Sequence, residues 1–284
     1  MKSVSLASIA AFALFAAAPL RLAAQAGPGA ASQNAAAQSS APQGAAPQGA
    51  PAAPGRGGRG RGQGRGDWPP SGPTPRTADG KPDLSGNWEP NAINMNVDMV
   101  GRGGVAVPFQ PWAEALYKER KTNISKDDPE ARCLPPGVPR MSTTPYPFRI
   151  VQTPNLTVIV YEGGAHIWRQ IFTDGRPHSK DPNPSWLGES IGHWEDDTFV
   201  VDTIGNNGKT WIDESGLPTT DALHVIERFR RIDLGHMEIE HTVDDPKAYT
   251  KPWTFTTRPT MLRGELIEYI CQENNRDVEH LVGK

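Results

Sequence analysis

The sequence predicts an all-β fold, either an antiparallel β-barrel or a sandwich of two sheets, with one short helix. From Pro145 onward, short segments rich in Val, Ile, Phe, Tyr and Trp alternate with turn signals such as Pro-Asn, Gly-Gly and Asp-Gly. No helical segments alternate with these strands, so a parallel α/β sheet is not expected. The stretch 81–284 holds roughly 200 residues, enough for a single β domain with a complete core.

The first 26 residues have the composition of a signal peptide. Lys2 supplies a positive start, residues 4–20 are apolar, and Ala24-Gln25-Ala26 fits the small-residue cleavage pattern. We therefore expect export to the periplasm or the extracellular space. The rest of the sequence contains no apolar run of about 18 residues, so we expect no transmembrane segment.

Residues 27–80 are predicted to form a disordered linker. They are rich in Ala, Pro and Gln at first, and in Gly and Arg over residues 55–66. Such a composition buries too little apolar surface to offset the entropy lost on ordering. We expect the arginines to make weak contacts, at most, with anionic polymers of the cell envelope.

Charge is divided unevenly along the chain. Six of the 29 basic residues and none of the 32 acidic residues lie in residues 1–66. The remainder therefore holds 23 basic and 32 acidic residues, a net charge of −9. An acidic domain argues against nucleic-acid binding, so a small molecule is the expected partner.

Two features precede the run of strands. Trp88, at the end of Asp83-Leu-Ser-Gly-Asn-Trp, marks the first predicted strand, and residues 89–109 look irregular. Residues 111–121 form the predicted helix, because Pro suits a first helical turn and Trp112, Ala115 and Leu116 share one face. We expect this helix to pack against the strands, with a lid over a barrel mouth as the alternative.

The strands expected after Pro145 are short and are separated by turn residues. In order, they are 148–153, 156–162, 165–172, 190–195, 198–203, 222–232, 236–243, 253–258 and 265–272.

The pair 190–195 and 198–203 reads as a β-hairpin around two aspartates. A two-residue loop places Trp194 opposite Phe199. One face of the hairpin is then apolar, whereas the other carries His193 and further polar side chains, as expected for a sheet with one side on a core.

The pair 222–232 and 236–243 reads as a second hairpin, with Gly235 in a three-residue loop. This loop sets Glu227 directly opposite His241, among side chains that point to the core. A carboxylate and an imidazole facing a barrel interior can act as an acid–base couple, so both are candidate catalytic residues. A buried ion pair that fixes the strand register is the alternative.

Two long loops, 175–187 and 205–220, interrupt the regular pattern. Loops of this length in a compact domain are often functional, and tryptophans in both argue against disorder. We expect a ligand-binding rim, with structural plugs as the alternative, and Trp186 and Trp211 in one pocket. The candidate ligand-binding residues are His178, Trp186, Trp211, Asp213 and, in the strand before the first loop, Arg169.

Several motif classes are absent from the sequence. It contains neither a GxxxxGKS nor a GxGxxG motif, so no nucleotide cofactor is expected. Its seven histidines lack the spacings of metal sites, so no metal is expected either. The two cysteines, Cys133 and Cys271, are predicted to form a disulfide, because an even count in an exported chain favours one.

Short motifs carry a resemblance to a known group of proteins. They are Pro82-Asp-Leu-Ser-Gly-Asn-Trp88, Pro184-Ser-Trp186, Trp194-Glu-Asp-Asp-Thr198, Glu227-Arg-Phe-Arg-Arg231 and Asp244-Asp-Pro246. From Pro82 onward the sequence resembles a family of secreted proteins of soil bacteria that has no established activity. The Gly-x-Trp at Trp88 also resembles the motif with which lipocalin barrels begin, where the Trp closes the barrel base. Both resemblances imply an exported β domain.

The sequence thus favours an exported β-barrel that binds a small, partly apolar molecule at a loop-lined mouth. An acid–base enzyme on the same scaffold is the first alternative, a hydrolase, lyase or isomerase acting on sugars or plant aromatics. A structural protein of the cell envelope is the second.

Overall fold

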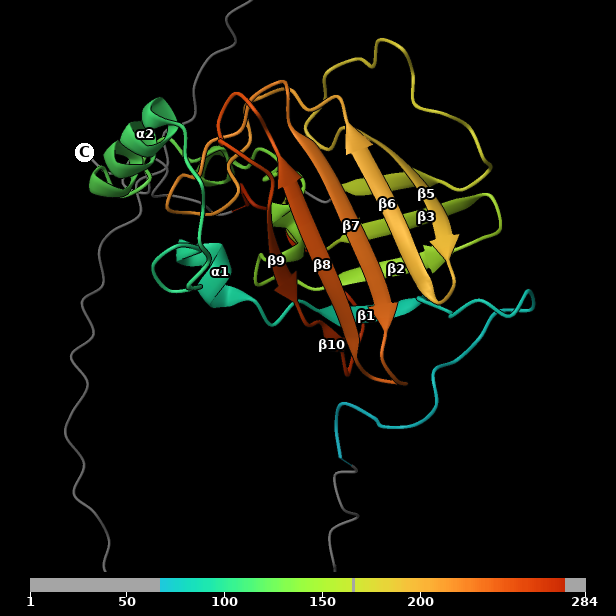
Figure 1. Cartoon of the computed structure of the whole chain (residues 1–284). Coiled ribbons are helices and arrows are strands. Elements are labelled where there is room, and N and C mark those ends of the chain that lie inside the picture. Colours follow the sequence, from blue (N-terminus) through green and yellow to red (C-terminus); the bar gives the residue numbers. More distant parts are fainter. Residues whose placement is uncertain (1–66, 165–166, 274–284) are drawn as a thin grey trace, which may run out of the picture. The chain divides into compact units, whose positions relative to one another are not determined.

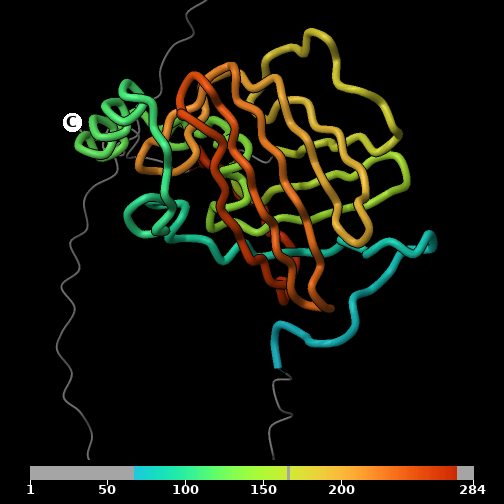
Figure 2. Tube along the Cα trace, in the orientation of Figure 1, coloured from blue at the N-terminus to red at the C-terminus, as the bar shows by residue number. Residues whose placement is uncertain are grey.

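The computed structural model describes residues 67–164 and 167–273 (Figures 1 and 2). The predicted signal peptide and most of the predicted linker lie outside these residues. None of the helices in the described ranges is long and apolar enough to cross a membrane.

One ten-stranded sheet forms the body of the fold. The predicted all-β class is therefore confirmed, and of its two forms the sandwich of two sheets is not adopted. The strands run in the order β10-β1-β2-β3-β4-β5-β6-β7-β8-β9. They are β1 (Gly86–Glu89), β2 (Phe148–Gln152), β3 (Leu156–Tyr161), β4 (Trp168–Phe172), β5 (Glu189–Glu195), β6 (Thr198–Ile204), β7 (His224–Arg231), β8 (Met237–Asp244), β9 (Trp253–Thr257) and β10 (Thr260–Met261).

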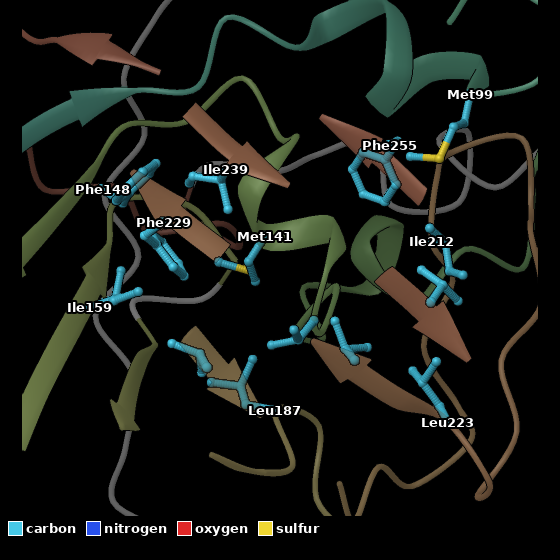
Figure 3. Close-up of a cluster of buried hydrophobic side chains, with 14 of the residues drawn as sticks. Met99, Met141, Phe148, Ile159, Leu187, Ile212, Leu223, Phe229, Ile239 and Phe255 are labelled. Carbon is cyan, nitrogen blue, oxygen red and sulfur yellow. The ribbon is translucent and has the colours of Figure 1, made fainter. Parts of the chain in front are cut away.

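The sheet curls so that its two edge strands, β9 and β10, follow each other directly in the chain. β9 pairs with β8, and β10, which follows two residues later, pairs with β1. Figure 1 shows β6 to β9 as one wall, with β2 and β3 crossing behind it. Side chains from both walls meet in the core, where Phe148 and Ile159 pack near Phe229 and Ile239 (Figure 3).

Trp88, which the lipocalin resemblance places at the barrel base, is a core residue of β1. The indole is fully buried, donates from Nε1 to the Leu84 carbonyl at 3.0 Å, and lies 5.0 Å from the guanidinium of Arg231. This contact fixes the start of β1 against the end of β7.

Both predicted hairpin registers are confirmed. Trp194 pairs with Phe199 in the first hairpin. In the second, Glu227 pairs with His241. Two- and three-residue loops between alternating strands therefore sufficed to set these registers.

The prediction of a last strand at 265–272 is wrong. β10 is formed instead by Thr260–Met261, and it occupies the free edge of β1. Residues 265–270 then have no strand partner, and Ile267 remains 68% exposed.

The structure corrects the domain boundary set at residue 81. Residues before it already pack on the domain: Gly72 accepts a hydrogen bond from the Leu234 backbone, and Thr74 donates to the Arg231 carbonyl. Arg76 makes a two-pronged ion pair with Asp197, at 2.9 and 2.6 Å. The segment 67–80 therefore belongs to the folded domain and not to a linker.

The predicted disulfide is confirmed: Cys133 is bonded to Cys271. Cys271 lies in a turn and not, as predicted, in the last strand. The bond ties the C-terminal segment to η1 (Pro129–Arg132), whose C-cap is Cys133.

The predicted helix is present as α2 (Pro111–Thr122), but its buried face differs from the prediction. Ala113 and Tyr117 are buried, whereas Trp112 is 46% exposed and donates to the Lys247 carbonyl. A short helix, α1 (Ile93–Asp98), lies in the stretch expected to be irregular, and η2 (Arg140–Ser142) is a further single turn.

The end of the barrel expected to form an open mouth is filled by side chains. Met99 and Met141 from the segment before β2, Ile212 from the second long loop, and Leu223 just before β7 join the core (Figure 3). The loop 205–220 is therefore a plug, the alternative left open by the sequence.

Candidate functional site

The junction of β4 and β5 interrupts an otherwise antiparallel sheet. The two strands are parallel and share only two residue pairs, Ile171 with Ser190 and Phe172 with Ile191. The connection between them is the long yellow segment in Figure 1. Because the paired stretch is so short, the wall opens on both sides of it, and each opening leads into a hollow.

A row of inward-facing residues runs behind this junction. Successive pairs align Gly192 with Val201, Val201 with Glu227, Glu227 with His241 and His241 with Phe255. The His241 ring stacks on Phe255, with centroids 4.5 Å apart. Two ionisable groups thus lie side by side in the barrel interior, as the hairpin register predicts.

Arg169 completes a buried cluster around these two groups. Its Nη1 lies 2.5 Å from Oε2 of Glu227, while Nδ1 of His241 lies 3.3 Å from Oε1. Both contacts fall outside regular hydrogen-bond angles, and the contact with Arg169 is an ion pair. Arg169 also donates to the hydroxyls of Ser190 and Thr203, at 2.9 and 2.6 Å.

The charge of the Glu227 carboxylate is neutralised by the neighbouring side chain of Arg169 and not by solvent. All three ionisable side chains are at most 2% exposed. Burial alone would raise the pKa of Glu227, but the charge of Arg169, followed by the contact with His241, outweighs it and lowers that pKa to about 2. Glu227 is therefore held as a carboxylate, and a carboxylate with so low a pKa is a weak base.

Acid should weaken the fold through Glu227. Because its pKa falls from the ordinary 4.5 to about 2 in the folded protein, the unfolded chain binds the proton more tightly. The stabilisation is complete at pH values above the ordinary pKa. It is lost as pH falls toward the pKa of the folded protein, and the total loss is roughly 3 kcal/mol. Urea unfolding at about pH 6 and about pH 3 should show more than half of this loss, since pH 3 still lies above the folded pKa of about 2. Glu227→Gln should flatten the pH dependence, whereas Glu195→Gln, at an exposed site, should not; equal slopes for both variants would contradict the assignment.

The first opening forms a hollow of about 440 Å³ with aromatic walls, which we call the upper hollow. Trp168 and Phe172 line it from the outer face of β4, and Trp186 lines it from the connecting loop. Arg169 and Ser190, members of the buried cluster, lie at its floor. Trp168 is 63% exposed, which is unusual for an indole and marks a surface that nothing in the described residues covers.

His178 holds the connecting loop beside the upper hollow. Its Nδ1 lies 3.0 Å from Glu189 and its Nε2 3.1 Å from Asp202, so the ring bridges two carboxylates. Ser179 also donates to Glu189, from its backbone and its hydroxyl, and these bonds lower the pKa of Glu189. His178 thus ties the connecting loop to β5 and β6.

The second opening, on the other side of the paired residues, forms a larger hollow of about 560 Å³, which we call the lower basin. Gly192 and Thr157 line it from the barrel wall, Trp194 from β5, and Thr77 and Asp79 from the segment before β1. It lies where β5 continues past the end of β4.

No family model matches the chain, and no curated protein matches it. Among solved structures, a crystal structure of a mutant of the fluorescent protein UnaG is similar, with a TM-score of 0.31 and 11% identity. The match covers 64% of this chain and 97% of that protein. A likeness at this level carries no argument about a ligand or an activity, and the resemblance to secreted soil-bacterial proteins stays a prediction.

The predicted ligand-binding residues divide into two groups. Arg169, Trp186 and His178 come together at the β4–β5 junction. Trp211 does not join them: it is 4% exposed and lies 4.2 Å below the guanidinium of Arg120, in a separate hollow. The expectation that Trp186 and Trp211 line one pocket is therefore wrong, because the second loop folds into the core.

Asp213 has a structural position in that second loop. Its carboxylate accepts backbone hydrogen bonds from Met99, Gly216 and Leu217 at 2.8 to 3.0 Å. Burial raises its pKa to about 6, against the opposing effect of these bonds. The residue closes the loop, and it is fully buried.

The sequence analysis missed one residue of the junction and one contact. Trp168 falls in a predicted strand but is not among the candidates. Arg169 is among the candidates, but its alternation with Ile167 and Ile171 also places it on the inward face of its strand, where it contacts Glu227. A buried arginine requires a buried carboxylate, so this alternation was a signal for a partner such as Glu227.

Proposed function

We propose that the protein binds a small, partly apolar molecule through an aromatic ring in the upper hollow. The observation that carries this proposal is the exposed indole of Trp168 in one hollow with Trp186 and Phe172. Three aromatic side chains offer flat faces for stacking, and a few polar groups at the floor fix the orientation of a ligand.

Size and shape support the same proposal. A volume of about 440 Å³ lies within the range of small-molecule sites. The Phe172 ring is covered on one side by Arg176, whose guanidinium lies 4.0 Å from the ring centroid. That arginine is held by Asp174, so this wall of the hollow is formed before a ligand arrives.

The enzyme alternative requires a substrate to reach Glu227 and His241. Both side chains are 0% exposed, and the carboxylate of Glu227 contacts the guanidinium of Arg169 and the imidazole of His241. The carboxylate is thus neutralised by an arginine, and catalysis would require the cluster to open. Ring binding in the open hollow needs no such change, so we favour it over an acid–base reaction.

Removing the exposed indole should weaken binding without affecting the fold. Trp168→Ala should reduce affinity for single-ring aromatic probes about fivefold to tenfold, the value of one stacking contact. We suggest indole, phenol and ferulate as probes, with affinities measured by isothermal titration calorimetry. The free energy of unfolding should change by less than about 0.5 kcal/mol, since Trp168 buries little surface.

Trp112→Ala provides the matched control. Trp112 is 46% exposed, similar to Trp168 in kind, but it lies on α2 and outside the upper hollow. The control should bind the probes as the unchanged protein does. Equal binding by both variants, or no saturable binding of any probe to the unchanged protein, would contradict the proposed function.

A further inference from the structure

The lower basin differs from the upper hollow in its chemistry. Its lining includes the hydroxyls of Thr77, Thr157 and Thr173, the amide of Gln152 and the imidazole of His193. Trp194 supplies a single aromatic face, and the described lining residues include one carboxylate, Asp79, and no lysine or arginine. Hydroxyl and amide groups both donate and accept, which suits a neutral ligand with many hydroxyl groups.

Thr157 is the group that points most directly to a ligand. The residue is 2% exposed, faces inward from β3 and lines the basin. The Thr153 and Thr173 hydroxyls donate to backbone carbonyls. The Thr157 hydroxyl belongs to the barrel wall of the basin, where a hydroxyl can donate to or accept from a ligand that enters it.

The rim of the basin is held in place before any ligand binds. The backbone from Thr77 to Lys81 forms a tight turn, with the Thr77 and Gly80 amides bonded inside it. Arg76 anchors this turn to Asp197 at the tip of the β5–β6 hairpin, and the Thr77 hydroxyl donates to Asp79. The carboxylate of Asp79 is therefore oriented at the mouth, and that bond helps to lower its pKa.

The indole of Trp194 is backed by the core. It packs against Phe199 with ring centroids 5.1 Å apart, while it also lines the basin. A sugar ring has apolar C–H faces and hydroxyls around its edge, so it matches one indole face surrounded by hydroxyl, amide and carboxylate groups.

We propose that the lower basin binds a neutral saccharide, with its ring on Trp194 and its hydroxyls bonded to Thr157, His193 and Asp79. The volume of about 560 Å³ falls in the range of small-ligand sites. The proposal is independent of the upper hollow, because Trp168 and Trp186 do not line the basin.

Calorimetric titration of the full chain with cellobiose, maltose and lactose tests this site. At least one of these neutral disaccharides should bind with saturable heat below about 10 mM. Thr157→Val keeps the side-chain shape and removes the hydroxyl, so it should weaken binding about fivefold. Asp79→Asn, at the exposed rim, should weaken it by a similar factor.

Thr254→Val is the matched control, since Thr254 is an exposed strand residue of β9 outside the basin. Both this variant and Trp168→Ala should bind the saccharide unchanged. Absence of saturable heat with all three sugars overturns the proposal. Binding that Thr157→Val and Asp79→Asn leave unaltered also overturns it, because the sugar would then occupy another surface.

Discussion

Replacing Arg169 by Met should destabilise the protein by about 3–5 kcal/mol, several times the cost of losing an exposed ion pair. The variant keeps most of the side-chain volume but removes the cation that lies 2.5 Å from Glu227. The carboxylate is then buried with only His241 beside it, and the hydroxyls of Ser190 and Thr203 lose their donor. Urea unfolding at neutral pH measures the effect.

Arg230→Met is the matched control for this experiment. Arg230 also pairs with a glutamate across a hairpin, at 2.7 Å from Glu238, but its side chain is 57% exposed. Its loss should cost less than about 1 kcal/mol, because water replaces the partner. Adding Glu227→Gln to Arg169→Met should recover part of the stability, since the unpaired charge is removed. Similar costs for the two arginine variants would mean that the buried pair does not govern stability.

The hairpins show what local sequence patterns can determine. In the pair β7 and β8, Gly235 and the alternation of apolar residues fixed the register that brings Glu227 to His241. The Trp194–Phe199 pair followed from a two-residue loop in the same way. These features depend only on residues close together in the chain, so the sequence predicts them well.

Pairings between distant segments do not follow from such local patterns. The parallel contact of β4 with β5 joins strands separated by a long loop, and no local pattern predicts its two residue pairs. Both hollows and the contact of Arg169 with Glu227 arise from this junction. The sequence therefore placed Trp186 among the ligand candidates but could not bring it into one hollow with Trp168.

The segment 265–272 shows a different cause of error. Its Leu, Ile and Tyr residues resemble those of a strand, yet a strand needs a free edge to pair with. β1 lies between β2 and β10, so the short strand Thr260–Met261 has already taken that edge. Ile267 and Ile270 consequently remain 68% and 46% exposed.

The second large effect is expected from the disulfide. Replacing both Cys133 and Cys271 by Ser should lower the free energy of unfolding by about 3–5 kcal/mol. The bond spans 138 residues of sequence, so its loss greatly increases the entropy of the unfolded chain. The folded state should change little, because Arg140 holds the segment before β2 separately, through two 2.8 Å contacts to Asp128.

The slope of urea unfolding distinguishes an effect on the unfolded chain from one on native contacts. Without the cross-link, the unfolded chain exposes more surface, so the m-value of the double variant should rise as its stability falls. Dithiothreitol should shift the unchanged protein toward the variant and leave the variant itself unaffected. Lower stability with an unchanged m-value would assign the loss to native contacts around η1 and the C-terminal turn. A variant within about 1 kcal/mol of the unchanged protein would show instead that the unfolded chain is already compact without the bond.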